Sequence, residues 1–207
     1  MAKLGRIAAI GGGLVALAGA GAALMAYRER KAEHPDYAVI DSDSDGDIEI
    51  RDYPALIVAE TVAPGDRLSA LNAGFDRLSD YIAGRHRGPG DPRPEEKIAM
   101  TAPILADRTE RGQWRTRFVM PATYALDALP TPDVGVHVAE LPARRMAAIR
   151  FPGSAGDEAL AEHERALRFW LAEHGHAAAG PAEHAYYNSP FVPPPLRHNE
   201  VLVPVAG

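Results

Sequence analysis

Histidines and carboxylates, the side chains that most often bind metal ions, occur at two notable spacings in this chain of 207 residues. His174 and His176 form an H-x-H pair at the end of a segment with an apolar stripe. Two imidazoles make a poor metal site without a third ligand or a carboxylate beside them. We therefore interpret the pair as part of a packed helix end. The eight histidines of the chain are His34, His86, His137, His163, His174, His176, His184 and His198.

The acidic run DSDSDGDIEIRD has the outline of a calcium-binding loop. Alternate aspartates from Asp41 to Asp45, followed by Gly46 and a carboxylate at the twelfth position, match the spacing of an EF-hand. The residues that follow alternate apolar and charged side chains, as in a strand, and Pro54 blocks the helix that must leave such a loop. Asp52 also stands where the motif has a bidentate glutamate. We predict a solvated acidic segment.

Composition excludes several classes of chemistry. The chain has no cysteine, which excludes disulfides, thiolate catalysis and thiolate metal ligation. Its net charge of −6 is opposite to that of a nucleic-acid-binding surface, so no nucleic-acid partner is expected. Nucleophile-elbow, phosphate-loop, dinucleotide and H-E-x-x-H motifs are absent. Any reaction would depend on a bound cofactor, and we do not expect an enzyme.

The first segment, residues 1–32, differs from the rest in hydropathy. Ile7 to Ala26 runs about 20 residues without a charge, enough for a helix that spans a bilayer. We predict an uncleaved membrane anchor, with a cleaved signal peptide as the alternative because small residues end the stretch. Both an anchor and a signal peptide at the start of a globular domain are most simply explained as export signals, so we expect a periplasmic domain. Residues 33–47 are predicted to be an acidic linker, and residues 48–207 the folded domain.

The spacing of apolar residues predicts an α+β fold. Helices are predicted at residues 67–83, capped by Asp66, and at residues 157–174, ended by Gly175. Strands are predicted at IEIRDY (48–53), ALIVAETV (55–62), KIAMTAPILA (97–106), WRTRFVMP (114–121), VHVAEL (136–141), RRMAAIRF (144–151) and NEVLVPV (199–205).

The two halves of the domain repeat one order of elements, strand–strand–helix–strand–strand. A Pro-Ala turn at Pro54 recurs at Pro142, 88 positions later, and KIAMTAPI aligns with AYYNSPF through Pro103 and Pro190, 87 positions apart. We expect the latter two stretches to be the same structural element used twice. Two such units would close into a distorted antiparallel β-barrel with two packed helices, and the groove between helices and sheet would be the natural pocket.

These motifs, in this order, resemble the SOUL/haem-binding protein family. The stretches concerned are IEIRDYP, VAET, DYIAG, KIAMTAPI, FVMP, YALDALPTP, AAIRFPG, AYYNSPF and RHNEV, which together cover essentially Ile48 to Val205. Membership implies a duplicated barrel similar to bacterial effector-binding domains. It also implies non-covalent binding of haem or another tetrapyrrole in a hydrophobic cleft beside the first helix.

The resemblance also implies which residues form that cleft. Some members have a histidine where this chain has Asp52, so no iron ligand can be transferred there, and the metal ligand is unknown. His86, which replaces an asparagine of the family, is a candidate axial ligand. Arg85, Arg87 and Arg197 lie near the motifs and would meet the propionates. The cleft itself would be formed by the helix stripe and the KIAMTAPI segment, through Leu68, Leu71, Phe75, Leu78, Ile82 and Met100.

The predicted function is tetrapyrrole binding for transport, buffering or sensing. Each part has a plainer interpretation: the helix stripe can be ordinary core packing, and Met100 can be a core filler instead of a soft contact to a porphyrin. Two other functions stay open, namely a small-ligand or partner-binding module without tetrapyrrole, and a tetrapyrrole-modifying enzyme.

Overall fold

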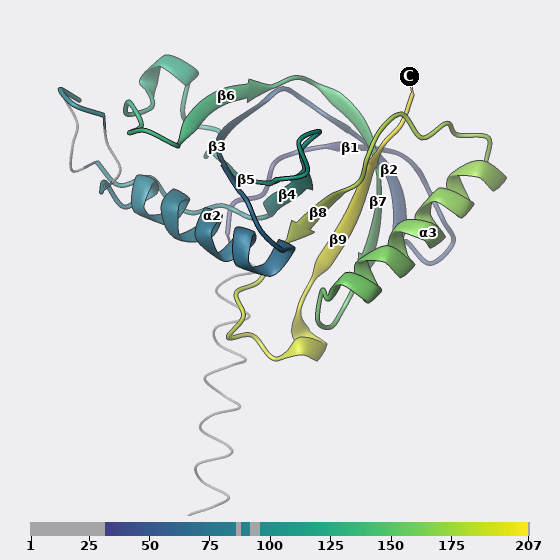
Figure 1. Ribbon diagram of the computed structural model, residues 1–207. Coiled ribbons are helices and arrows are strands. Elements are labelled where there is room, and N and C mark those ends of the chain that lie inside the picture. Colours follow the sequence, from purple (N-terminus) through teal and green to yellow (C-terminus); the bar gives the residue numbers. More distant parts are fainter. Residues whose placement is uncertain (1–31, 86–87, 92–95, 207) are drawn as a thin grey trace, which may run out of the picture.

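The computed structural model describes residues 32–85, 88–91 and 96–206, and Figure 1 shows how their helices and strands are arranged. Each half of the domain contributes two strands, a helix and two strands, which confirms the predicted α+β fold. The elements are, in chain order, β1 (Ala38–Ser42), β2 (Ile48–Tyr53), β3 (Leu56–Ala63), α2 (Arg67–Ile82), β4 (Ile104–Arg108), β5 (Trp114–Val119), η1 (Leu126–Ala128), β6 (His137–Leu141), β7 (Arg144–Phe151), α3 (Asp157–Glu173), β8 (Glu183–Tyr186), η2 (Pro194–Leu196) and β9 (Asn199–Pro204).

The strands form one antiparallel sheet that curls into a half-barrel. Their order is β1-β2-β7-β9-β8-β4-β5-β3-β6. If β1 is set aside, the order reads symmetrically from either end: β2 pairs with β7 as β6 pairs with β3, and β4 pairs with β8 at the centre. The turns at Pro54 and Pro142 occupy equivalent places, between β2 and β3 and between β6 and β7. The predicted duplication is therefore present in the fold.

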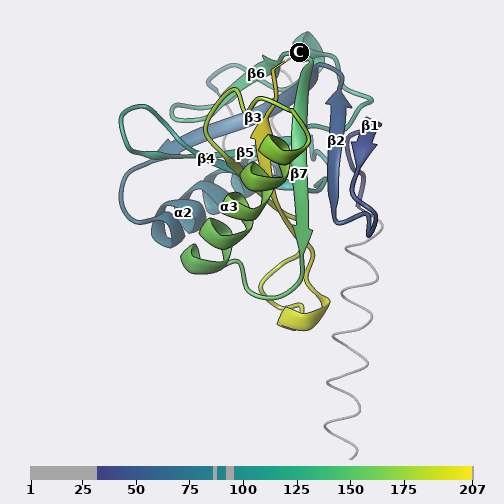
Figure 2. The ribbon, with the colours of Figure 1, turned by 90° about the vertical axis from the view of Figure 1, so that its right-hand side faces the viewer.

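The segment that we expected to be a linker, residues 33–47, contains β1. This strand pairs with β2 along an edge of the sheet, as Figure 2 shows. Its side chains are exposed, so it gives no burial pattern in the sequence. The acidic turn that follows is closed by Asp43, whose carboxylate accepts a hydrogen bond from the Ile48 amide, while Gly46 takes a φ of 74°. No cluster of three metal-binding side chains occurs in the described part of the chain.

The alignment of KIAMTAPI with AYYNSPF was wrong at the level of structure. Pro103 precedes β4, which begins at Ile104, whereas Pro190 follows β8, which ends at Tyr186. The two prolines therefore lie at opposite ends of their strands. Residues Lys97 to Pro103, predicted as part of a strand, belong to no strand, because β4 begins only at Ile104. Ile98 of this stretch is buried in the core beside α2, and its amide donates to the Ile82 carbonyl.

Both helices cover the outer face of the curled sheet. The core beneath α3 joins Leu160, Leu167 and Leu171 to apolar residues of β2, β7 and β9. The core beneath α2 joins Leu78, Tyr81 and Ile82 to residues of β3 and β5. Figure 1 shows that the two helices begin near each other and run apart. Arg67 of α2 connects these starts through an ion pair with Asp157 of α3.

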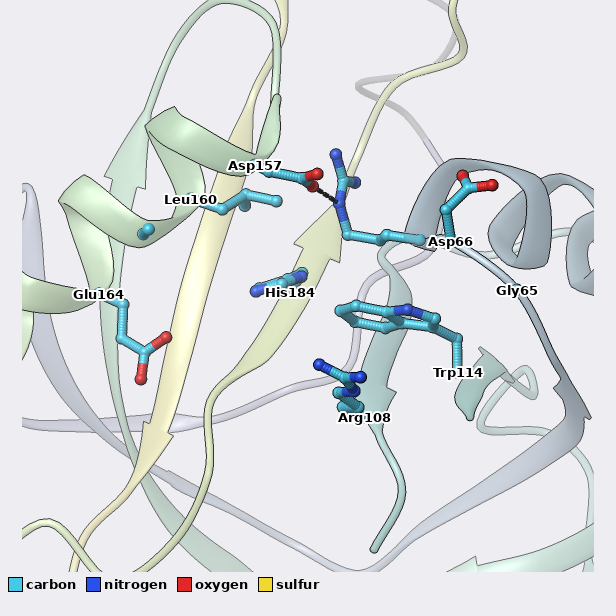
Figure 3. A pocket seen from close by; sticks show the side chains of 10 residues that line it. Gly65, Asp66, Arg108, Trp114, Asp157, Leu160, Glu164 and His184 are labelled. Carbon is cyan, nitrogen blue, oxygen red and sulfur yellow. Dashed lines mark hydrogen bonds and ion pairs between the residues drawn. The ribbon is translucent and has the colours of Figure 1, made fainter. Parts of the chain in front are cut away.

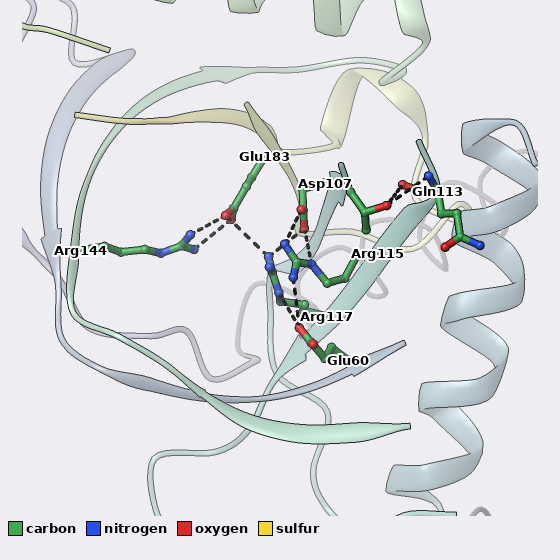
Figure 4. A network of polar contacts seen from close by, with 8 residues as sticks. Glu60, Asp107, Gln113, Arg115, Arg117, Arg144 and Glu183 are labelled. Carbon is green, nitrogen blue, oxygen red and sulfur yellow. Dashed lines mark hydrogen bonds and ion pairs between the residues drawn. The ribbon is translucent and has the colours of Figure 1, made fainter. Parts of the chain in front are cut away.

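The inner face of the half-barrel is filled by the protein's own side chains. A third apolar core occupies its centre, built from Tyr53, Val58, Leu105, Val119, Met146, Ala148, Ala185 and Leu202. Beside it lies the network of Figure 4, in which Arg117 pairs with Glu60 at 3.0 Å and with Asp107 at 2.9 Å, while Arg144 binds Glu183. Paired charges are the form in which ionised groups tolerate burial.

No helix among the described residues has the length and apolar character needed to cross a membrane. The predicted anchor, Ile7 to Ala26, lies outside those residues. Membrane attachment and periplasmic location therefore stay predictions from the sequence.

Candidate functional site

Helix α2 presents an apolar surface to solvent along one flank. Asp66 caps the helix by accepting a hydrogen bond from the Ser69 amide, and the buried face beyond includes Ala70, Gly74, Leu78 and Tyr81. The flank carries Leu68, which is 60% exposed, the half-buried Leu71 and Phe75, which is 37% exposed. Exposed apolar side chains next to one another on a helix that also has a buried face make this flank a candidate surface for another molecule.

The segment that contains Met100 runs beside α2. It begins where Ile98 meets the end of the helix and continues into β4, where Ile104 pairs with Phe118. The Phe118 ring in turn contacts the Phe75 ring, with 5.7 Å between centroids. Met100 is 46% exposed. We call Leu68, Leu71, Phe75 and Met100 the α2 patch.

Two of the predicted cleft residues lie in the core and not on the surface. Leu78 and Ile82 are buried in the core between α2 and the sheet. The apolar stripe of α2 therefore has two parts: one edge packs against the sheet, and the other edge faces solvent. For these two residues the core-packing interpretation describes their position, and they would support the α2 patch from beneath.

The predicted basic residues differ in how free they are. Arg85 is exposed and pairs with Asp80. Arg197 donates to the carbonyl oxygens of Val192 and Pro190 and so holds the loop before β9. His86 and Arg87 lie outside the described residues. Lys97, which the sequence analysis did not select, is an exposed cation three positions before Met100.

A pocket of about 420 Å³ lies elsewhere on the outer face, between the starts of α2 and α3 and above β4, β5 and β8 (Figure 3). Its floor is formed by Arg108, Trp114 and His184, none of which we singled out from the sequence. The sequence contained a partial signal for this pocket. Arg108 and Trp114 are paired residues of neighbouring strands, so their side chains lie on the same face of the sheet. What it could not show is which helices flank that face.

His184 is uncharged at neutral pH. Burial, together with the positive charge of Arg67, lowers the pKa of His184 to about 4. The imidazole lies 5.8 Å from the Trp114 ring, centroid to centroid. A neutral imidazole can donate one hydrogen bond and accept another.

Comparison with known proteins places the chain in a family. A family model described as SOUL heme-binding protein matches residues 32–204. The chain belongs to the SOUL heme-binding protein family. This confirms the resemblance found in the motifs and extends it back through β1. No curated protein matches the chain.

Solved structures similar to this SOUL protein agree with its architecture. The C-terminal domain of EcmrR aligns with a TM-score of 0.56 at 11% identity, over 77% of this chain and 96% of that one. A structure described as a hydrolase from Listeria innocua aligns with a TM-score of 0.52 at 12% identity, over 77% of this chain and 91% of that one. An uncharacterized conserved protein from the same organism aligns with a TM-score of 0.53 at 10% identity, over 77% of this chain and 92% of that one. Identities this low show a shared fold alone.

The α2 patch of this SOUL protein fits one property of haem, its flat apolar ring. Leu68, Phe75 and Met100 offer aliphatic, aromatic and thioether surface, all of which pack well against a porphyrin face. No histidine belongs to the patch among the described residues, and only the Met100 sulfur has lone pairs for iron. The patch is therefore an apolar contact surface without an imidazole ligand.

Proposed function

We propose that this SOUL-family protein binds haem or another tetrapyrrole, non-covalently, on the α2 patch. The observation that carries the proposal is an apolar flank of α2 left exposed in a chain whose family model is named for haem binding. The opposite face of the helix forms a core with the sheet, while Leu68 on this flank stays 60% exposed and Phe75 is only partly covered by Phe118. Transport, buffering or sensing of a tetrapyrrole would each use such a reversible site.

Apolar contact alone can supply a useful affinity. Burying about 400 Å² of apolar surface on ligand and protein together gives roughly 10 kcal/mol at ~25 cal/mol per Å². Micromolar binding requires about 8 kcal/mol, and part of the gross gain is lost as the ligand is immobilised. Leu68, Phe75 and Met100 would therefore hold the ring with micromolar affinity or somewhat less, without requiring a bond to iron. Bound haem would supply iron chemistry, while the chain supplies the surface that orients the ring.

Absorbance titration of the full chain with haem tests the proposal. We expect a saturable change in the Soret band for the wild type. Phe75→Glu and Met100→Glu each place a carboxylate in the α2 patch and should weaken binding about tenfold or more, because the charge must lose its water beneath the ring. Phe169→Glu is the matched control, since Phe169 is 69% exposed on α3, and its titration should equal that of the wild type.

Iron-free protoporphyrin provides the second arm of the titration. Since the patch holds the ring, protoporphyrin should bind with an affinity similar to that of haem. A wild type that gives no spectral change with haem at tens of micromolar would refute the proposal, and so would Glu variants that titrate like Phe169→Glu. Near-ultraviolet circular dichroism of each variant shows whether the fold is retained.

A further inference from the structure

The pocket between the starts of α2 and α3 has an aromatic wall with a cation next to it. Arg108 of β4 and Trp114 of β5 are directly opposed partners in the sheet ladder, so their side chains leave the same face as close neighbours. His184 of β8 completes the floor beside the Trp114 ring, and Leu160 and Glu164 of α3 form the facing side (Figure 3). A volume of about 420 Å³ lies within the range of small-molecule sites.

Most charged groups around the pocket are already engaged. Asp66 accepts hydrogen bonds from both the amide and the hydroxyl of Ser69. Glu164 pairs with Arg168 at 2.9 Å. Arg67 is engaged through all three of its nitrogens, because it binds Asp157, the Tyr186 hydroxyl at 2.9 Å and a backbone carbonyl. These groups shape the opening and leave little capacity to bind a ligand ion.

Arg108 and His184 are the groups that stay available. Among the described residues no carboxylate pairs with Arg108, whose contact within the protein is a long bond of 3.4 Å to the Gly112 carbonyl. His184 Nδ1 is buried without a hydrogen-bond partner in the described part of the chain. Because an orphaned buried N–H is rarer than an orphaned acceptor, the proton belongs on Nε2. His184 then acts toward the pocket as a donor, which does not suit a bond to iron.

We propose that this pocket is a second binding site, distinct from the α2 patch, for a small planar aromatic carboxylate. The ring would stack on Trp114, and the carboxylate would accept hydrogen bonds from Arg108 and from His184 Nε2. Charge-assisted bonds to a carboxylate are among the strongest that a protein side chain makes. None of the α2 patch residues lines this pocket.

Calorimetric titration of the full chain with 2-naphthoate tests the site. We expect one bound naphthoate per chain with a dissociation constant of about 1 mM or tighter, the affinity reached by a ligand of this size with ordinary efficiency. Arg108→Gln should weaken naphthoate binding about tenfold, and Trp114→Leu should weaken it as well. Arg165→Gln, at an exposed α3 position outside the pocket, is the matched control and should bind as the wild type does.

Two further arms decide the ligand class and the separateness of the site. 2-Naphthylmethylammonium has the same ring with a positive charge, and we expect it to bind more weakly than 2-naphthoate. Stronger binding of the cation would overturn the proposal, because it would show that the pocket's own carboxylates, Asp66, Asp157 and Glu164, determine which charge binds. Naphthoate binding should be unchanged by saturating haem, whereas competition would place both ligands at one site and overturn the proposal. Equal naphthoate affinity in wild type and Arg108→Gln would also refute it.

Discussion

At the scale of single residues, the most constrained pair is Arg51 and Glu200 on the inner face. Each is 1% exposed, and the guanidinium makes two parallel bonds of 2.9 Å to the carboxylate. The Tyr187 hydroxyl and His198 also contact the carboxylate, at 2.7 and 3.0 Å. Every oxygen of Glu200 is therefore satisfied. Buried ion pairs stabilise a fold only in this condition.

Glu200→Gln should lower the free energy of unfolding by about 3 kcal/mol at pH 7, because the buried Arg51 loses its main counter-charge. Burial raises the pKa of Glu200, but bonds from His198 and Arg51 outweigh burial and bring it to about 2. The stabilisation is thus present above the ordinary carboxyl pKa and is lost as pH falls toward 2.

Urea unfolding between pH 7 and pH 2 measures this contribution. The wild type should lose stability steeply below about pH 4.5, and Glu200→Gln should lose less over the same interval because it lacks the titrating group. Glu162→Gln, at an exposed position on α3, is the control and should follow the wild type. Parallel pH curves for wild type and Glu200→Gln would show that the pair does not act as argued.

The sequence could identify the charged residues but not their partners. Arg197 was expected at a ligand's propionates, yet it binds two carbonyls of its own loop. Arg51 and Glu200, 149 positions apart, meet only because β2 and β9 both flank β7. An arginine has the same local signature in either setting, so the assignment depends on which strands become neighbours.

At the scale of elements, the seating of α2 on the sheet depends on one glycine. Gly74 lies directly over Thr116 of β5, and a Cβ at this position would come within 2.7 Å of the Thr116 Cβ. The glycine is thus required by the close approach of helix and strand. In the sequence it appears only as a residue that weakens a helix.

Gly74→Ala should lower the free energy of unfolding by about 2 kcal/mol, because the added methyl overpacks the interface with Thr116. In an exposed helix position the same change would stabilise by up to about 1 kcal/mol. Chemical denaturation of the variant tests the sign. Asn72→Ala, at an exposed position of α2, is the control and should be neutral or slightly stabilising. A stabilised Gly74→Ala variant would contradict the close contact.

At the scale of the whole molecule, the two halves of the chain are interleaved. β7 of the second half lies beside β2 of the first, and β6 beside β3. The core under α3 includes Ile48 and Ile50 from the first half, and the core under α2 includes Val136 from the second. Each helix therefore needs strands from both repeats.

Neither half should fold alone. We expect residues 32–134 and residues 135–207, expressed separately, to show no cooperative thermal transition by circular dichroism, because each lacks the strands on which its sheet and cores depend. A mixture of the two should recover the transition if the fragments associate. The intact chain, as control, should unfold in a single step. A cooperative transition in either isolated fragment would show that the repeats are independent units.

What the sequence by itself determined is local or repetitive: the periodicity that defines α2, α3 and most strands, the Pro-Ala turn that marks the duplication, and the motifs that identify the SOUL family. Only the tertiary structure decided that Leu78 and Ile82 are buried while Leu68 and Phe75 face solvent. It also decided that Pro103 and Pro190 are not equivalent. The same holds for the pocket that Arg108, Trp114 and His184 share. Side-chain spacing follows from the geometry of one element, whereas exposure and partnership arise where distant elements meet.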